Sequence, residues 1–250
     1  MLVKSVVFVA LLVLFPGFTW HAVAAERVVL ATLEWPPYTG ESLPDGGAAS
    51  AVVREAFRAM GYELELRFYP WNRVLHEARE NPEIAGYFPE YPENWRREGF
   101  LKSRSIGTSP LGLASRAEVA INWRSLDDLA RYTLGTVAGY ANTLEFDAMA
   151  ARGRLTTDAS NSDTLNLRKV LAGRVDAAVV DANVFDHLRK VDPVLRAARD
   201  ELAFNDRLLG INELVVCFPD TEVGARMLRI LDQGLPAVDQ AAIYRRHFSQ

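Results

Sequence analysis

Helical and strand-like patterns alternate along most of this sequence, with only short connections between them. Residues 49–60 place apolar side chains at helical spacing and stop at Gly61, a residue typical of helix C-termini. Residues 64–68 then alternate apolar and polar side chains, as a half-buried strand does. The same rhythm begins again after residue 114. This alternation predicts an α/β protein with two open sheets.

The pattern also predicts where the individual elements lie. The expected strands are 28–33, 64–68, 84–88, 133–137, 155–157, 177–180 and 214–218. The expected helices are 49–60, 71–79, 141–151, 161–172, 182–191, 223–231 and 238–247, with a short capped helix after Ser125.

The first 25 residues have the layout of a secretory signal peptide. Lys4 precedes an apolar run over residues 6–15, and small residues follow at 22–25. The run is broken by Pro16 and Gly17, and it is shorter than the roughly 20 residues that a membrane span needs. We therefore expect residues 1–25 to be cleaved after Ala24 or Ala25 and the remainder to be released into the periplasm.

Charge and cysteine content narrow the possible partners. The chain carries a formal net charge of −4 at pH 7, and loss of Lys4 makes it one unit more negative. This charge disfavours nucleic acid or an anionic membrane as partner. Cys217 is the only cysteine and lies in an apolar strand, so we expect it to be buried and to form no internal disulfide. The sequence has no zinc-type histidine pair and no phosphate-binding loop, so no metal or cofactor is expected.

Four short segments occur in a consistent order. They are 35–38 (WPPY), 92–94 (PEN) followed by Phe100, 135–139 (GTVAG) and 171–181 (LAGRVDAAVVD). In order and spacing they resemble the bacterial extracytoplasmic solute-binding proteins of family 3, the receptors that serve amino-acid ABC transporters. The last segment is the closest match, and the resemblance extends over residues 28–248.

The resemblance implies a two-lobed, periplasmic-binding-protein-like fold with a hinge and a cleft between the lobes. Lobe one would be 26–111 plus 212–250, and lobe two would be the inserted residues 112–211. The ligand would lie in the cleft, beyond the carboxyl ends of the strands, as open α/β sheets require. Binding would close a monomeric protein, and a membrane permease or sensor would recognise the closed form.

Asp181 ends a buried apolar strand and precedes a helix, which leaves two interpretations open. It is a helix N-cap, a position that Asp fills well, or it presents a carboxylate to a ligand's ammonium or hydroxyl group. The resemblance implies an amine-binding carboxylate here. One residue can serve both purposes.

Gly139 and Tyr140 follow another predicted strand, at the expected start of a helix. Backbone amides at such a place favour an anion, and the alternative is a helix start without ligand. The resemblance implies a Ser or Thr pair here, but this chain has Tyr140 and Ala141.

The position that the resemblance assigns to a carboxylate-clamping Arg is Asn94. An amide cannot form the bidentate ionic pair of a guanidinium, which argues against an ordinary α-amino acid as ligand. Arg96 or Arg97 would replace the clamp if the loop is shifted; otherwise both face solvent.

Aromatic side chains stand at strand ends that face the expected cleft. There they would stack on a planar ligand or surround a cation. Trp71 lies on an apolar helix face, so we expect it to pack in the core. The aromatic residues expected in the site are Trp35, Tyr38, Phe88 and Tyr91.

Together these features predict a binding protein that captures a small polar solute, amine-bearing or aromatic, for an ABC-type transporter. One alternative is an extracytoplasmic enzyme of the same fold, similar to cyclohexadienyl dehydratases, with Glu34, Glu90 and Asp181 as candidate acids. Another is a ligand-sensing input to a membrane signalling protein. No Gly-x-Ser-x-Gly nucleophile motif occurs, and we expect no enzymatic activity.

Overall fold

The computed structural model of this protein describes residues 26–92 and 99–249. The expected signal peptide, Asn94, Arg96 and Arg97 lie outside these residues. Within the described ranges, no helix combines the length and the apolar character needed to cross a bilayer.

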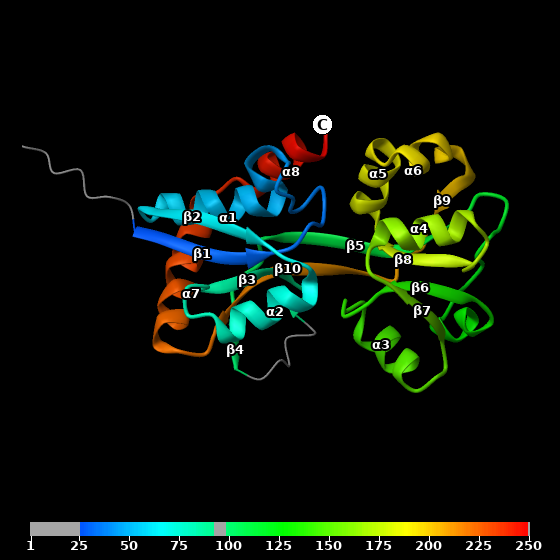
Figure 1. Ribbon diagram of the computed structural model, residues 1–250, viewed down its shortest axis with the longest axis horizontal. Helices are drawn as coiled ribbons and strands as arrows, with labels where there is room; N and C mark the ends of the chain where they lie inside the picture. The colour runs from blue at the N-terminus through cyan, green and yellow to red at the C-terminus, as the bar shows by residue number, and fades with distance from the viewer. Residues whose placement is uncertain (1–25, 93–98, 250) are drawn as a thin grey trace, which may run out of the picture.

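The chain forms two lobes, each built on a mixed sheet (Figure 1). We call lobe one the part around β1–β4 and lobe two the part around β6–β9. Lobe one contains β1 (Glu26–Thr32), β2 (Tyr62–Phe68), β3 (Gly86–Glu90) and β4 (Phe100–Lys102). Lobe two contains β6 (Thr133–Val137), β7 (Thr156–Ser160), β8 (Ala177–Asp181) and β9 (Leu202–Phe204).

Helices pack around both sheets (Figure 1). In lobe one they are α1 (Ala48–Ala59), α2 (Trp71–Glu80), α7 (Glu222–Gly234) and α8 (Gln240–Phe248). In lobe two they are α3 (Leu144–Ala151), α4 (Asp163–Leu171), α5 (Ala182–Val191) and α6 (Pro193–Ala197). Short 3-10 helices span Pro44–Gly46, Leu126–Arg131, Arg199–Glu201 and Leu235–Ala237.

Two long strands, β5 (Gly107–Arg116) and β10 (Gly210–Pro219), connect the lobes (Figure 1). They pair antiparallel from Gly210 opposite Leu111 to Leu214 opposite Gly107. Beyond this shared stretch β10 pairs with β3 and β4, while β5 pairs with β8 and β9. The two expected sheets are therefore joined through β10 and β5 into one continuous sheet, with the strand order β2-β1-β3-β10-β5-β8-β6-β7.

Each lobe contains a set of neighbouring strands that run parallel to one another. Strand β1 runs parallel to β2 and β3, and β6 runs parallel to β7 and β8.

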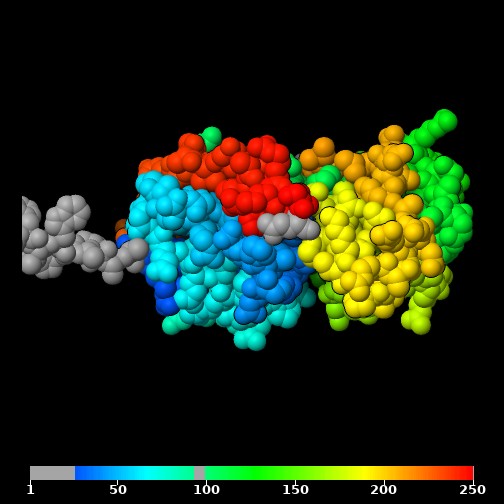
Figure 2. All heavy atoms as spheres, turned by 90° about the horizontal axis from the view of Figure 1, so that it is seen from above, coloured from blue at the N-terminus to red at the C-terminus, as the bar shows by residue number. Residues whose placement is uncertain are grey.

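Buried apolar side chains form one cluster that extends from Leu30 and Phe57 in lobe one to Leu167 and Phe185 in lobe two. The lobes are thus in contact, as the seam between them in Figure 2 shows.

The sequence-based boundaries agree closely where the pattern is strong. Strand β6 and helix α5 have the expected bounds, and Gly61 follows α1 with a φ of 81°. Cys217 is buried and forms no disulfide, as expected. Helix α3 differs: it begins at Leu144 rather than at 141, because the Thr143 side chain accepts the Phe146 backbone N–H at 3.2 Å and caps the helix there.

Helices α1 and α7 approach each other closely at Gly234. A Cβ added to Gly234 would lie 2.0 Å from the Ala56 carbonyl oxygen. We expect Gly234→Ala to lower the free energy of unfolding by about 1 to 3 kcal/mol, since the backbones must move apart. Gly210→Ala is the matched control, because its nearest new contact is an ordinary 3.4 Å from Thr143. Urea unfolding of both variants measures this, and equal stabilities would contradict the packing described.

Candidate functional site

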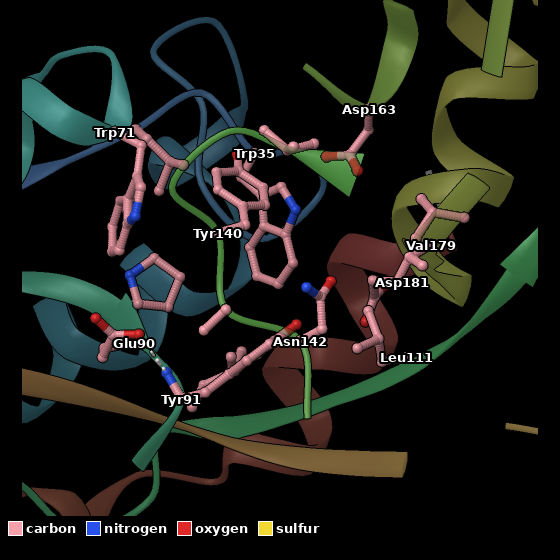
Figure 3. Close-up of a pocket in the computed structure, with 16 residues that line it drawn as sticks. Trp35, Trp71, Glu90, Tyr91, Leu111, Tyr140, Asn142, Asp163, Val179 and Asp181 are labelled. Carbon is pink, nitrogen blue, oxygen red and sulfur yellow. Dashed lines mark hydrogen bonds between the residues drawn. The ribbon is translucent and has the colours of Figure 1, made fainter. Parts of the chain in front are cut away.

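Two adjoining cavities lie between the lobes. The inner cavity has a volume of about 50 Å³ and the outer groove one of about 670 Å³. Six residues line both, and we call them the neck: Leu33, Trp35, Trp71, Val137, Tyr140 and Asp163. Residues from both lobes surround the inner cavity (Figure 3), and the shared lining joins it to the outer groove.

Strand direction explains why polar and aromatic side chains gather here. Leu33 follows β1 and Glu90 ends β3, while Val137 ends β6 and Asp181 ends β8. All four residues line the inner cavity. The carboxyl ends of the parallel strands in the two lobes thus face each other across the cavity, the usual place for a ligand in open α/β sheets.

A tight loop after β1 holds Trp35 and Tyr38. The backbone N–H groups of Trp35 and Thr39 each donate to the other residue's carbonyl oxygen, at 2.9 and 3.1 Å. The Trp35 and Tyr38 rings stack with their centroids 4.4 Å apart and their planes inclined by 17°. Tyr244 and Phe248 of α8 contact Tyr38 edge-on, at 6.1 and 5.3 Å. Packing from two directions therefore fixes both rings.

Tyr38 connects lobe one directly to lobe two. Its hydroxyl donates to Asp181 Oδ2 at 2.9 Å and accepts from Asn183 Nδ2 at 2.7 Å. The Thr108 carbonyl oxygen on β5 lies 3.1 Å from the same hydroxyl. The Tyr38 side chain is fully buried and does not line either cavity. It fastens the lobes beside the site.

Asp181 is the N-cap of α5, as one of the two interpretations expected. Its Oδ1 accepts the backbone N–H groups of Asn183 and Val184, at 2.7 and 2.9 Å. Its Oδ2 accepts the hydroxyls of Ser109 and Tyr38, at 2.6 and 2.9 Å. These four bonds use the acceptor sites of a carboxylate. Burial raises the pKa of Asp181 to about 6, and the same four hydrogen bonds oppose that rise.

A hydroxyl chain leads from Tyr91 to Asp181. The Tyr91 and Ser109 hydroxyls lie 2.7 Å apart. Because the Ser109 proton goes to Asp181, Tyr91 is the donor to Ser109. Tyr91 lines the inner cavity with its ring. Burial and the nearby Asp181 charge raise the Tyr91 pKa well above its usual value.

Asp163 is a buried acid that the sequence analysis did not single out. It is the first residue of α4, it is only 8 % exposed, and it lines both cavities. In Figure 3 its carboxylate points toward Trp35. Burial, and then the Asp181 charge, raise its pKa to about 7, while its own backbone N–H and Trp35 oppose the rise. The one sequence signal that could have identified Asp163 is its position just after the end of a strand, β7.

Trp71 packs against the core, as expected, and it also lines both cavities. Its indole Nε1 donates to the Gly139 carbonyl oxygen at 3.0 Å, a second direct bond between the lobes. Its ring meets Tyr140 edge-on at 6.1 Å. The apolar face of α2 packs on the lobe-one strands β1 and β3, and Trp71, the first residue of the helix, also reaches lobe two.

Gly139 and Tyr140 do not form a helix N-terminus, because α3 begins four residues after Tyr140. The Tyr140 backbone N–H instead donates to the Val137 carbonyl oxygen at 3.1 Å. Tyr140 still lines both cavities, whereas Gly139 lines neither. The expected amide pair for an anion is therefore not formed at this turn.

The remaining expected site residues fall outside the cavities or outside the described residues. Phe88 is fully buried and lines neither cavity. Asn94 and Arg96 belong to residues 93–98, which the structure does not describe. Over the described part of the chain, no three His, Cys, Asp or Glu residues are grouped to hold a metal ion.

Comparisons with known proteins identify the fold. No protein-family model matches this sequence, and no curated protein does. Solved structures do match: the ligand-binding core of GluR0 from Nostoc punctiforme, in complex with L-glutamate, has a TM-score of 0.70 at 17% identity, over 89% of this chain and 97% of that one. The amino-acid ABC transporter substrate-binding protein AbpA from Streptococcus pneumoniae, bound to L-arginine, has a TM-score of 0.70 at 16% identity, over 89% and 94%.

A histidine kinase sensor domain with similarity to periplasmic binding proteins is also alike in structure. It has a TM-score of 0.73 at 16% identity, over 90% of this chain and 96% of that chain. These similarities establish a two-lobed, periplasmic-binding-protein-like fold, as the sequence analysis predicted.

The two buried acids make stability depend on pH in a definite direction. Because the pKa values of Asp163 and Asp181 are raised to about 7 and 6, the native state binds more protons than the unfolded state between roughly pH 4 and pH 7. Their contribution to the free energy of unfolding therefore falls as pH rises through this window. The lowered pKa values of His187 and His247 act in the opposite direction.

We expect Asp163→Asn to remove part of this dependence. The variant should match the parent near pH 4 and exceed its stability at pH 8 by at least about 1.4 kcal/mol, the value of one pKa unit. Urea unfolding from pH 4 to pH 8 measures this difference. Asp158→Asn is the control, since Asp158 is an exposed acid on neighbouring β7, paired with Lys169. Parallel curves for parent and Asp163→Asn would contradict the assigned environment.

Proposed function

We propose that this protein is an exported solute-binding protein. It captures a small polar solute, amine-bearing or aromatic, between two closing lobes and presents it to an ABC-type transporter. The observation that carries this proposal is the neck, where acidic and aromatic side chains from both lobes surround one continuous space. The moving units are residues 26–111 with 212–250 and residues 112–211.

The connection between the lobes suits a hinge. The chain crosses between them in β5 and β10, whose shared stretch runs from Gly107 to Leu111 and from Gly210 to Leu214. Two neighbouring strands can bend together without breaking the ladder on either side. The Tyr38–Asp181 bond lies beside this stretch, since Tyr38 also bonds to Thr108 of β5, and the Trp71–Gly139 bond joins the lobes at the cavity wall. Closure of this kind encloses a ligand at the neck.

The structural neighbours support an amino-acid-like solute. One is bound to L-arginine and another to L-glutamate. The neck offers aromatic faces from Trp35, Trp71 and Tyr140 and a carboxylate from Asp163. We propose that these side chains, with Tyr91, contact the solute. Tyr38 and Asp181 hold the closed geometry around it, so Asp181 acts on the solute through the lobe contact.

The three acids that the enzyme alternative named are all engaged in hydrogen bonds. The carboxylate of Asp181 is held by four hydrogen bonds. Glu90 accepts the Tyr87 hydroxyl and the Tyr91 backbone N–H, and Glu34 accepts the Glu41 backbone N–H. Acids engaged in this way are poorly placed for proton transfer to a substrate. A turnover assay with cyclohexadienyl acids tests the enzyme alternative.

A sensing role is the second candidate, and it rests on the similarity to a histidine kinase sensor domain. The binding event would be the same, but a membrane signalling protein would recognise the closed form. The neighbouring genes distinguish the two, since a transporter needs a permease and a sensor needs a kinase or cyclase.

A solute screen tests the proposed function. The mature protein is heated with amino acids, amines, aromatic acids and short peptides, and the melting temperature is followed. A ligand at 100 times its Kd stabilises the native state by about 2.7 kcal/mol, so a true solute should raise the melting temperature clearly. Absence of any stabilising solute across these classes would contradict the proposal.

Tyr38→Phe should weaken solute binding without removing the stacked ring. The variant loses the hydroxyl that joins Asp181 to lobe one, and a hydrogen bond to a charged group contributes about 1.5 to 3 kcal/mol. The closed form is then less favoured, and calorimetry should show an affinity lower by about one to two orders of magnitude. Tyr62→Phe on β2 is the control and should bind as the parent does. Equal affinities for Tyr38→Phe and the parent would show that closure does not depend on this bond.

A further inference from the structure

The charges around the cavities are one-sided. Over the part of the chain that the structure describes, no Lys or Arg lines either cavity. The acids that do line them are Glu90, Asp163 and Asp181 in the inner cavity and Glu34, Glu41 and Asp163 in the outer groove. A solute here therefore meets carboxylates from both lobes, and Asp163 is the acid common to both spaces.

Asp163 differs from Asp181 in how its charge is balanced. Asp181 has four hydrogen-bond donors around its oxygens. Asp163 forms no ion pair with any described residue, although only 8 % of its surface is exposed to solvent. Burying a carboxylate without a countercharge is unfavourable, and the neighbouring Asp181 adds to the cost. A positive group in the neck would relieve it.

The aromatic side chains beside Asp163 suit the same kind of group. Tyr38 stacks on the Trp35 ring, and Trp35 lines both cavities next to Asp163. Trp71 and Tyr140 line the same neck and meet edge-on. Aromatic faces beside a carboxylate attract organic cations, because the ring quadrupole and the acid act on the same positive charge.

We propose, on the basis of the solute-binding function above, that the solute carries an organic cation that pairs with Asp163 in the neck. The cation is a protonated amine, a guanidinium or a quaternary ammonium group, and it lies against Trp35 and Tyr140. Asp163 is thus the acid that contacts the solute, and Asp181 positions the lobes.

The titratable groups near Asp163 are consistent with a cation as the partner. Asp181 and the phenols of Tyr91 and Tyr140 interact with its charge. Glu34, Glu41 and Tyr69 line the outer groove beside it. Each of these groups is an acid or a phenol, so a positive group on the solute would complement the described residues around the neck.

Matched probe pairs test the proposal at pH 8, where the Asp163 carboxylate is ionised. Each pair joins a cation to a neutral molecule of similar shape: benzylamine with benzyl alcohol, butylguanidine with butylurea, and choline with dimethylbutanol. Calorimetric titration of the mature protein should show that at least one cation binds about tenfold or more tightly than its partner, as a charge-assisted contact implies.

Variants assign that preference to Asp163. Asp163→Asn should erase it, while Asp158→Asn, which removes an equal charge from exposed β7, should keep it. Asp163→Glu retains the charge and should keep a reduced preference for the cation over its neutral partner. If Asp163→Asn does not fold, the affinity ratios of Asp163→Glu and of the parent test the role of Asp163.

Neutral probes that bind as well as cations, or a preference that survives Asp163→Asn, would overturn the proposal. So would failure of all three cations to bind. If the solute screen still finds a neutral or anionic ligand, the solute-binding function stands and only the cation assignment falls. If no solute binds in either experiment, both proposals fall.

Discussion

The hydrogen bond from Tyr38 to Asp181 is the contact on which the arrangement of the site depends. On one side, Tyr38 is fixed by its stack with Trp35 and by α8 packed against its edge. On the other, Asp181 ends β8 and caps α5. One buried bond of 2.9 Å therefore joins the loop after β1 to the end of a strand in lobe two. The distance between the lobes, and hence the shape of the neck, follows from it.

The two strands that cross between the lobes explain how the Tyr38–Asp181 bond affects solute binding. Since β10 pairs with strands of lobe one and β5 with strands of lobe two, bending can occur where the two pair with each other, while each lobe keeps its own sheet and helices. The neck lies between the strand ends of the two lobes, where rotation of one lobe against the other changes the space. A solute that pairs with Asp163 from one lobe and stacks on Trp35 from the other adds its own contacts to the Tyr38 bond. Solute binding then shifts the population toward the closed form.

Much of the fold was predictable because its strands and helices carry strong periodicity. Strand β6 and helix α5 have their expected bounds, and Asp181 caps α5 because an acid after a buried strand fits that position. Asp163 was not predicted, since its burial arises only when β7, α4 and lobe one come together. Trp71 packs against the core as its helical spacing predicted, but that spacing could not show its bond to Gly139 in lobe two. Such contacts between lobes are tertiary and leave no local pattern.

The most direct test of the account is the distance between the rims of the cleft with and without solute. Ser42 and Leu165 are exposed and follow Glu41 and Thr164, which line the outer groove from opposite lobes. Spin labels on Ser42→Cys and Leu165→Cys report this distance by pulsed electron resonance, and the native Cys217 is buried away from the label. Saturation with a solute from the screen should give a shorter and narrower distance distribution than the free protein. An unchanged distribution at saturation would contradict closure of the lobes around the solute.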